Sequence, residues 1–465
     1  MAVQVFIVIA VGVAFVLCTI LWLRLHAILA LLGGAIIVDA LSRILLGTNP
    51  DASSTEQVAT HLGRTAGQLT ILILMASVIG RCMLQSGAAD RIVRATLRLF
   101  GVRFAPAAFM SSGFLLGIPV FFDTVFYLMI PLGKALRART GRNYLLYVLS
   151  IVAGATMAHS LVPPTPGPLF VGEQLDVSLG KMILMGSIVG LATLIPGYLY
   201  ASGANARWDI PLRSTPDLSL EHLNAILDRP ETDLPPLSLS LLPVLLPVFL
   251  IACGTLLTTH ASPGQAFPTP VALVGTLAEK NSALILGALA ALAVYLLWAR
   301  PSRKEAADDL RAAVMGATTI ILITAAGGAF GAALRATGIA EVLSVGEGET
   351  SWTLLIVAFL ITTLIRTAQG SATVAMITAV GVVQSIVAHH TLPFDPVYLA
   401  LAIGCGSKPF AWMNDSGFWV ITTMSGLEER EALKAVTPMT AIMGVFGLAV
   451  TVALALTVPW PLGKL

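Results

Sequence analysis

The chain has 465 residues, of which 56% are hydrophobic and only 11% are charged, and its mean hydropathy is +0.87. Soluble domains carry about a quarter charged residues, so this composition excludes a soluble globular protein and predicts an integral membrane protein. The formal net charge of +2 gives no reason to expect nucleic acid as a partner.

The first apolar run, 2–22, has no basic residues before it and is longer than the core of a signal peptide. We therefore expect it to be an uncleaved first span. Seven further runs are long enough to cross the hydrocarbon layer as helices, which predicts an all-α polytopic membrane protein. These runs are 27–46, 68–85, 180–202, 241–259, 282–299, 312–335 and 435–458.

Four other apolar regions are too long for one span or are broken by proline, glycine and polar residues. They are 104–133, 144–175, 352–388 and 396–424. Irregular backbone survives in hydrocarbon only where protein or water satisfies its N–H and C=O groups. The interruptions therefore predict a protein-lined cavity near the middle of the bilayer.

Loop charges indicate the side from which two of these regions enter the membrane. Both flanks of 104–133 are rich in basic residues, which the positive-inside rule assigns to the cytoplasm. They are Arg91, Arg94, Arg98 and Arg103 before the region, and Lys134, Arg137, Arg139 and Arg142 after it. A segment with both ends on one side cannot cross once, so we expect a re-entrant hairpin. The flanks of 352–388 are acidic instead, which predicts a second hairpin entering from the outer side.

Two hairpins of opposite entry side predict two inverted-topology repeats, each with about five crossings, one hairpin and one broken helix. The predicted parts are a first repeat at 1–202 with hairpin 104–133 and broken helix 144–175, a cytoplasmic polar linker at 203–240, and a second repeat at 241–465 with hairpin 352–388 and broken helix 396–424. Such repeats are typical of secondary transporters, whose substrate site lies between the repeats.

Polar groups at the interruptions are candidates to bind a small hydroxylated anion. Half-helices that begin after a break point their positive dipole ends into the cavity, which favours anions. The alternative for any Ser or Thr here is a hydrogen bond between helices. The candidate substrate-binding residues are Gly117, Pro119, Ser160, Thr165, Gln369, Gly370, Ser371, Thr373, Lys408, Asn414 and Ser416.

Ionisable side chains within the membrane are costly and are functional by default. Asp123 is the one carboxylate in "GIPVFFDTVFYLMIPL" (117–132), and we expect it to face the cavity and to carry a proton during transport. Asp415 and His159 are alternative proton carriers, and the sequence does not choose among the three. Arg366 either faces the cavity or ends a helix at an aqueous boundary.

Other polar or reactive residues fit purely structural roles. Asp39 and Arg43 lie four residues apart in a span, a spacing that predicts an ion pair along one helix. The four cysteines lie in apolar runs without a CxxC motif, so we expect neither a disulfide nor a metal site, and no cofactor. They are Cys18, Cys82, Cys253 and Cys405.

At the four interruptions the chain resembles the gluconate permease (GntP) family of the ion-transporter superfamily. The matching motifs occur in family order. They are "GIPVFFD" (117–123), "HSLVPPTPGP" (159–168), "QGSATVA" (369–375) and "NDSGFW" (414–419). The resemblance implies secondary active transport of aldonates and similar hydroxy acids across the bacterial inner membrane, usually by proton symport, by a protein that forms homodimers.

The chain departs from the family pattern at two positions. Thr165 stands where gluconate-type members usually have His, and those members lack a lysine at the position of Lys408. The exact substrate therefore stays open, between gluconate and a shorter hydroxy acid or a sulfonate.

Three other functions are alternatives to a proton-coupled carrier. Sodium-coupled transport of a small carboxylate or sulfonate is an alternative, although the paired Ser-Asn-Thr tips of sodium-coupled relatives are missing. A membrane-embedded enzyme with Asp123 or His159 as general base is a remote alternative, because no HExxH or GxSxG motif occurs in the spans. A channel is disfavoured, since two occluding hairpins suit a gated carrier better.

Overall fold

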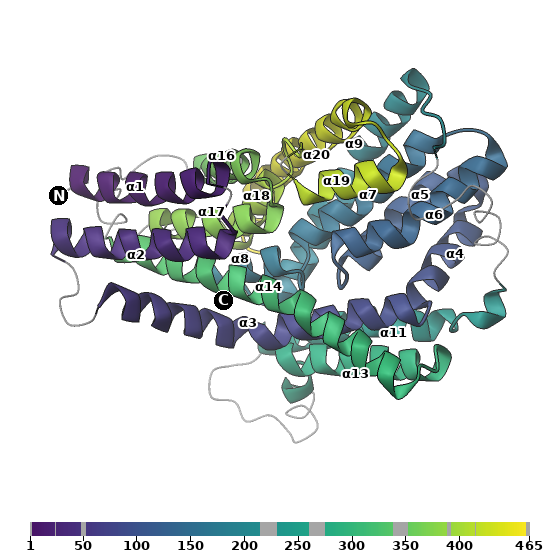
Figure 1. Cartoon of the computed structure of the whole chain (residues 1–465), viewed down its shortest axis with the longest axis horizontal. Coiled ribbons are helices and arrows are strands. Elements are labelled where there is room, and N and C mark those ends of the chain that lie inside the picture. Colours follow the sequence, from purple (N-terminus) through teal and green to yellow (C-terminus); the bar gives the residue numbers. More distant parts are fainter. Residues whose placement is uncertain are drawn as a thin grey trace.

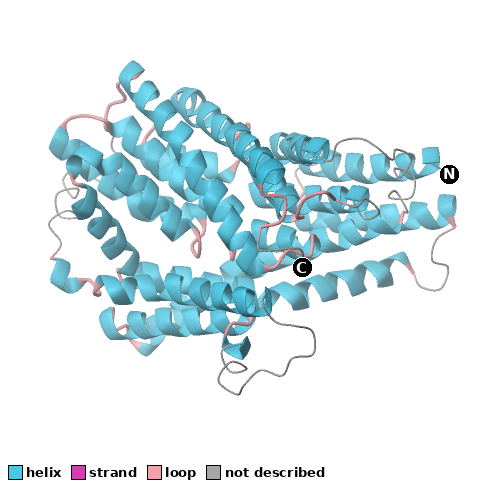
Figure 2. Cartoon of the chain, turned by 180° about the vertical axis from the view of Figure 1, so that it is seen from behind, coloured by secondary structure: helices cyan, strands magenta, loops and turns pink. Residues whose placement is uncertain are grey.

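The computed structural model of the protein describes residues 2–23, 25–47, 53–213, 230–259, 275–337, 352–387, 392–413 and 415–461. Every regular element in these ranges is a helix, as Figure 2 shows. A helix bonds all of its backbone groups internally, which is what a segment surrounded by lipid requires. The prediction of an all-α protein is confirmed.

The first part of the chain, up to the polar connection, contains nine α-helices among its described residues. They are α1 (Ala2–Leu21), α2 (Ala27–Leu46), α3 (Ser54–Gln85), α4 (Ala88–Phe100), α5 (Ala105–Gly117), α6 (Phe122–Thr140), α7 (Tyr144–Leu161), α8 (Pro166–Gln174) and α9 (Leu179–Arg207). A short 3-10 turn, Val102–Phe104, separates α4 from α5.

The second part follows another 3-10 turn, Glu231–Asp233, and consists of further helices. Those described are α11 (Leu237–Thr259), α13 (Lys280–Trp298), α14 (Arg303–Ala336), α16 (Trp352–Gln369), α17 (Ala372–Val387), α18 (Val397–Gly406), α19 (Ser416–Ser425) and α20 (Glu429–Thr457).

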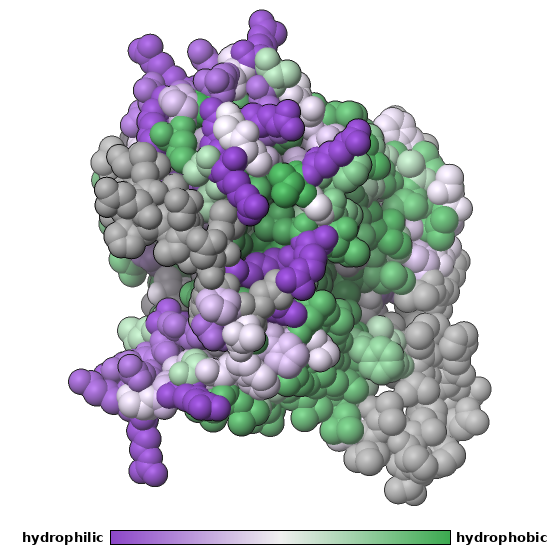
Figure 3. Space-filling view, turned by 90° about the vertical axis from the view of Figure 1, so that its right-hand side faces the viewer, coloured by the Kyte–Doolittle hydropathy of each residue, from purple (hydrophilic) through white to green (hydrophobic). Residues whose placement is uncertain are grey.

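Eight helical stretches in the described ranges are long and apolar enough to cross a membrane. They are Ala27–Leu46, Ser54–Gln85, Tyr144–Gln174, Leu179–Arg207, Leu237–Gly254, Lys280–Trp298, Arg303–Ala336 and Glu429–Thr457. Much of the face in Figure 3 is hydrophobic, with hydrophilic residues at its top, at its lower left and in a patch near its centre. The prediction of a polytopic membrane protein is therefore confirmed.

Two spans are longer than their apolar runs. The sequence predicts spans at 68–85 and 312–335, whereas α3 begins at Ser54 and α14 begins at Arg303. Each start is capped: the Ser53 hydroxyl accepts a hydrogen bond from the Glu56 N–H at 3.2 Å, and Ser302 forms a capping box with Glu305. The first turns of α3 and α14 are polar, so a search for apolar runs does not find them. They are helical nevertheless, because the caps satisfy the first N–H groups of each helix.

The helices form two groups. In the first, α3 and α2 pack against α14, α13 packs against α3, and α11 packs against α13. Figure 1 shows the purple α3 and the green α14 running together although they are far apart in the sequence. In the second group, α5, α7, α9 and α20 pack in succession, and α18 packs against α16 and α20. Helix α17 packs against α14 and joins the groups.

The basic connection before 104 is itself helical. Helix α4 carries Arg91, Arg94 and Arg98, and the chain then bends by 110° into α5. Arg94 Nε lies 2.9 Å from Asp90 Oδ1 one turn earlier, so part of this charge is paired along the helix.

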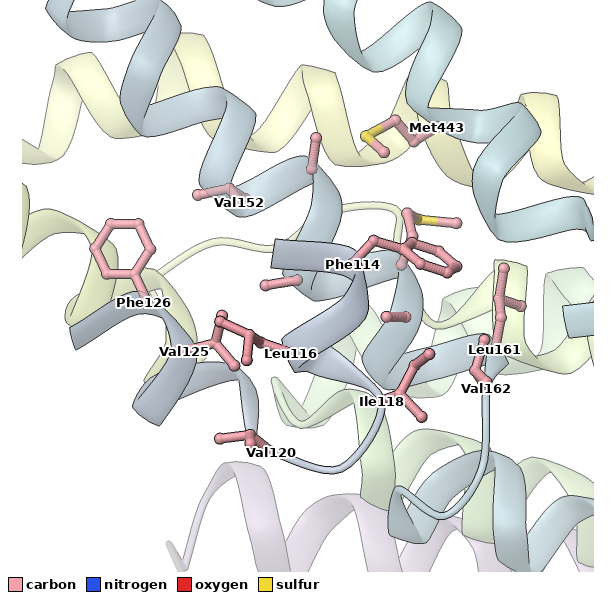
Figure 4. Packing of buried hydrophobic residues seen from close by; sticks show 14 of the residues in the cluster. Phe114, Leu116, Ile118, Val120, Val125, Phe126, Val152, Leu161, Val162 and Met443 are labelled. Carbon is pink, nitrogen blue, oxygen red and sulfur yellow. The ribbon is translucent and has the colours of Figure 1, made fainter. Parts of the chain in front are cut away.

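Four helix breaks lie inside the regions that the sequence marks as interrupted. They are 118–121 between α5 and α6, 162–165 between α7 and α8, 370–371 between α16 and α17, and 407–415 between α18 and α19. Gly370 has a φ of +85°, a conformation that glycine adopts without a steric penalty. Figure 4 shows Ile118 of the first break beside Leu161 and Val162, where α7 ends. That α5 with α6, and α16 with α17, enter and leave the membrane on the same side stays a prediction.

Close helix packing fixes the position of the first break. A Cβ on Gly154 of α7 would lie 2.2 Å from the Met110 carbonyl oxygen of α5, so only glycine lets these two backbones approach. Phe114 and Val125 belong to the buried core around the break. Because α5 and α7 cannot shift apart without opening this core, the start of α6 is held in place.

Candidate functional site

A cavity of about 370 Å³ lies between the two helix groups. One wall is α14, which contributes Gly316, Ile320 and Ile323. The opposite wall consists of the first residues of helices that follow breaks, namely Asp123 and Thr124 of α6, Ser371 and Thr373 at α17, Pro166 of α8 and Ser416 of α19. The volume is in the range of small-molecule sites.

Four helix N-termini therefore meet at this cavity. Neither α6 nor α8 has a side-chain cap, and at α17 the Ser371 hydroxyl accepts from the Val374 N–H at 3.3 Å. The helix dipole gives each N-terminus a partial positive charge, and uncapped N–H groups add to it at α6. The arrangement is chemically suited to an anion that also carries hydroxyl groups.

Asp123 lines the larger cavity from the first turn of α6 and is half-buried. Among the described residues it forms no ion pair and accepts no hydrogen bond, although the charge of Asp415 acts on it. His159 of α7 also lines this cavity and stands edge-on to Phe121, with the ring centroids 6.4 Å apart. The Nδ1 atom of His159 is buried without a hydrogen-bond partner in the described chain.

A second cavity of about 70 Å³ adjoins the first, and the two share Phe122, His159 and Ala372 as lining residues. Its other walls come from α7, α16, α20 and the break between α18 and α19. They include Thr156, Arg366, Ser407, Lys408, Asp415 and Thr440.

The smaller cavity is charged. Arg366 forms an ion pair with Asp415, and its Nε donates to the Ser407 carbonyl oxygen at 3.0 Å. Asp415 also accepts from the Gly417 N–H at 2.9 Å and so caps α19. Lys408 is buried and its Nζ donates to the hydroxyl and the carbonyl oxygen of Thr156, at 3.0 and 3.1 Å. Arg366 thus faces the cavity and does not end its helix at water.

Seven sequence candidates line one or both cavities. Asp123, His159, Ser371, Thr373 and Ser416 line the larger one, and His159, Lys408 and Asp415 line the smaller one. Gly370 is buried at the break just before Ser371. The side chain of Gln369 and all of Asn414 lie outside the part of the chain that the structure describes.

Four candidates lie behind the cavities in packed protein. Gly117 packs against α7, where an added Cβ would lie 3.0 Å from the Ala155 carbonyl oxygen. Pro119 lines a separate, small apolar pocket. The buried Thr165 hydroxyl donates to the Val162 carbonyl oxygen at 2.7 Å. The Ser160 hydroxyl is buried and has no hydrogen-bond partner among the described residues.

Several lining residues escaped the sequence analysis. Phe121, Phe122 and Thr124 flank Asp123, while Thr156 lies one helical turn before Ser160 and His159. Their closeness in sequence to Asp123 and His159 could have marked these four residues as candidates. Nothing in the local pattern of α14 marks Ile320 or Ile323, because an apolar residue facing a cavity and one facing lipid look the same in sequence.

The ion pair predicted in the second span is present. Arg43 Nε donates to Asp39 Oδ2 at 2.7 Å, within one turn of α2 and outside both cavities. The four cysteines are free thiols.

Comparison with known proteins identifies the family. The model of the GntP family permeases matches residues 4–457. The gluconate permease of Pseudomonas aeruginosa is 34% identical over 397 residues, which cover 85% of this chain and 86% of that protein. The inner membrane permease YgbN of Escherichia coli is 28% identical over 449 residues, which cover 95% of this chain and 96% of that protein.

The fold also has a relative of known structure. The crystal structure of the YdaH transporter from Alcanivorax borkumensis matches with a TM-score of 0.66 at 14% sequence identity, covering 95% of this chain and 100% of that one. At this identity the likeness concerns the fold alone. The family match and the membrane-spanning helices together identify the chain as a member of the GntP permease family, a multi-pass transporter of the bacterial inner membrane and not an enzyme.

Proposed function

We propose that the protein imports gluconate or a related sugar acid by proton symport. The observation that carries the proposal is the cavity of about 370 Å³ at which four helix N-termini meet beside an unpaired carboxylate. The similarity to the gluconate permease of Pseudomonas aeruginosa supports the substrate class.

Hydroxyl groups on the larger cavity would bind the hydroxylated chain of the substrate. Ser371 and Thr373 at the start of α17 and Ser416 at the start of α19 line it. Each hydroxyl can both donate and accept, as the substrate hydroxyls can. Gly370, Gln369 and Asn414 stay candidates at the same two breaks.

Asp123 is the strongest candidate for the coupling proton. It lines the cavity, is half-buried, and forms no ion pair and accepts no hydrogen bond within the described part of the chain. Asp415, by contrast, is paired with Arg366 and caps α19. An unpaired carboxylate can gain a proton without breaking an ion pair, so Asp123 suits reversible protonation better. His159 lies on both cavities and can relay the proton between them.

The helix order supports the two inverted repeats, 1–202 and 241–465, joined by the linker 203–240. The succession from α5 to α9 and the succession from α16 to α20 each consist of five helices, with a break between the first two and another between the third and fourth. Helix α17 packs on α8, and α6 packs on α19, so each hairpin helix meets the half-helix of the other repeat. In alternating access, the second helix group, which contains the broken helices, would then move relative to α14. We also propose a homodimer, formed by the first or second span of each repeat.

Proteoliposomes test this function. An inward pH gradient should drive accumulation of labelled gluconate, and Asp123→Asn should abolish accumulation while leaving gluconate exchange across the membrane, because exchange needs no net proton movement. Asp233→Asn, an exposed carboxylate outside both cavities, is the matched control.

Two outcomes would change the proposal. Accumulation by Asp123→Asn at the wild-type level would assign coupling to another residue, with Asp415 and His159 next. Accumulation that follows a sodium gradient at clamped pH would replace proton symport by sodium symport.

A further inference from the structure

The smaller cavity has a surplus of buried positive groups. Arg366 and Lys408 line it, whereas Asp415 is its one carboxylate among the described residues. Both cationic side chains are buried, at 3% and 4% relative exposure. When Lys408 carries its proton, the cavity therefore holds two cations for one anion. Burying an unbalanced charge is costly unless a counter-charge arrives.

Unused donors point to where that counter-charge belongs. Arg366 uses Nε and one terminal nitrogen, but its Nη1 is buried without a hydrogen-bond partner in the described chain. Lys408 makes both of its hydrogen bonds to a single residue, Thr156, and forms no ion pair with a described carboxylate. A buried guanidinium nitrogen left unpaired costs free energy that a carboxylate oxygen would recover.

The cavity has the right size for a headgroup and too little room for a whole sugar acid. A water molecule needs about 10–15 Å³ of accessible space, so about 70 Å³ accommodates a carboxylate. It shares Phe122, His159 and Ala372 with the larger cavity, so one elongated ligand can occupy both.

We propose that the smaller cavity is the carboxylate subsite of the transporter, in which Lys408 and Arg366 bind the acid group while the hydroxylated chain extends into the larger cavity. This assignment rests on the proposed function, because it takes a sugar acid as the substrate. It makes Lys408 the residue that selects an acid over the corresponding neutral polyol. Gly444 of α20 leaves room for this lysine, since a Cβ there would lie 3.0 Å from the Lys408 Cβ.

Equilibrium binding to the purified full-length protein tests the subsite, with D-gluconate and D-sorbitol as probes. Sorbitol has a comparable hydroxylated chain but no carboxylate. We expect the wild type to prefer gluconate, and Lys408→Gln to weaken gluconate binding by about 10- to 100-fold while sorbitol binding stays unchanged. Lys280→Gln is the matched control, because this lysine pairs with Glu173 outside both cavities.

A second variant covers the case in which Lys408→Gln does not fold. Thr156→Val keeps the side-chain volume but removes the hydroxyl that holds Lys408 Nζ, so we expect a smaller loss of the preference for gluconate. A preference for gluconate over sorbitol that stays within threefold of wild type in Lys408→Gln, or in Thr156→Val where Lys408→Gln does not fold, overturns the subsite and leaves the proposed function standing.

Failure of the proposed function has a different signature. If the wild type binds no sugar acid, acetate, lactate and methanesulfonate replace gluconate as probes. Binding of one of them that is lost in Lys408→Gln would support the anion subsite without a sugar-acid substrate. Binding of none of them would overturn both proposals.

Discussion

Two buried ion pairs in this protein are built differently. Lys181 of α9 lies 2.6 Å from Asp395, whose other oxygen accepts from the Val397 N–H and whose own N–H donates to the Pro459 carbonyl oxygen. This pair is away from both cavities, and its hydrogen bonds fasten α9 to the start of α18. The pair of Arg366 with Asp415 lies on a cavity and leaves one guanidinium nitrogen without a partner among the described residues.

The difference separates a structural pair from a binding pair. A buried charge network stabilises a fold only when each member is satisfied. The pair at Lys181 meets this condition without any ligand. The pair at Arg366 meets it only when a further acceptor is present, and in the proposed subsite the substrate carboxylate is that acceptor.

The largest expected effect is on the structural pair. Lys181→Met should lower the free energy of unfolding by about 3–5 kcal/mol, because Asp395 would stay buried without its cation. Thermal unfolding in detergent measures the loss, and the double variant with Asp395→Asn should recover most of it. Gluconate affinity of the folded fraction should not change. A stability loss below 1 kcal/mol would contradict the structural role.

A smaller stability effect is expected at the cavity pair. Arg366→Gln leaves Asp415 unpaired, but water in the cavity can solvate that carboxylate, so we expect a loss of about 1–3 kcal/mol. Gluconate binding should fall by at least tenfold, measured by equilibrium binding. If Arg366→Gln keeps the wild-type affinity for gluconate and loses as much unfolding free energy as Lys181→Met, the Arg366–Asp415 pair has a structural role like that of Lys181 and Asp395.

The smallest effect is expected at a surface pair. Arg137 lies 3.3 Å from Asp209, whose side chain is 87% exposed. Water screens this contact, so Asp209→Asn should change the free energy of unfolding by less than about 0.5 kcal/mol and leave transport intact. A measurable loss of uptake would instead assign this contact a role in the transport cycle.

Sequence patterns were reliable where the lipid environment imposes them. The runs at 27–46, 180–202 and 282–299 predict α2, α9 and α13 to within a few residues, since a span must be apolar over its whole buried length. The first turns of α3 and α14 are polar, so hydropathy does not predict where these two helices begin.

The candidate site was predictable in part. Asp123 was found because a lone carboxylate in an apolar segment is unusual, and it lines the larger cavity. Gly117 and Thr165 belong to the motifs at the first two breaks, yet Gly117 packs against α7 and the Thr165 hydroxyl donates to the Val162 carbonyl oxygen. A motif shows that a break exists, but it does not tell which of its side chains turn toward the cavity.

By itself, the sequence determined the membrane class, most of the spans, the four breaks and the family resemblance, because each depends on local composition or on a short motif. Only the tertiary structure decided that Lys408 meets Thr156, 252 residues earlier in the chain, and that Arg366 pairs with Asp415. Such contacts arise from how helices distant in the sequence pack together. The division of the site into a cationic cavity and a hydroxyl-lined one therefore became visible only in three dimensions.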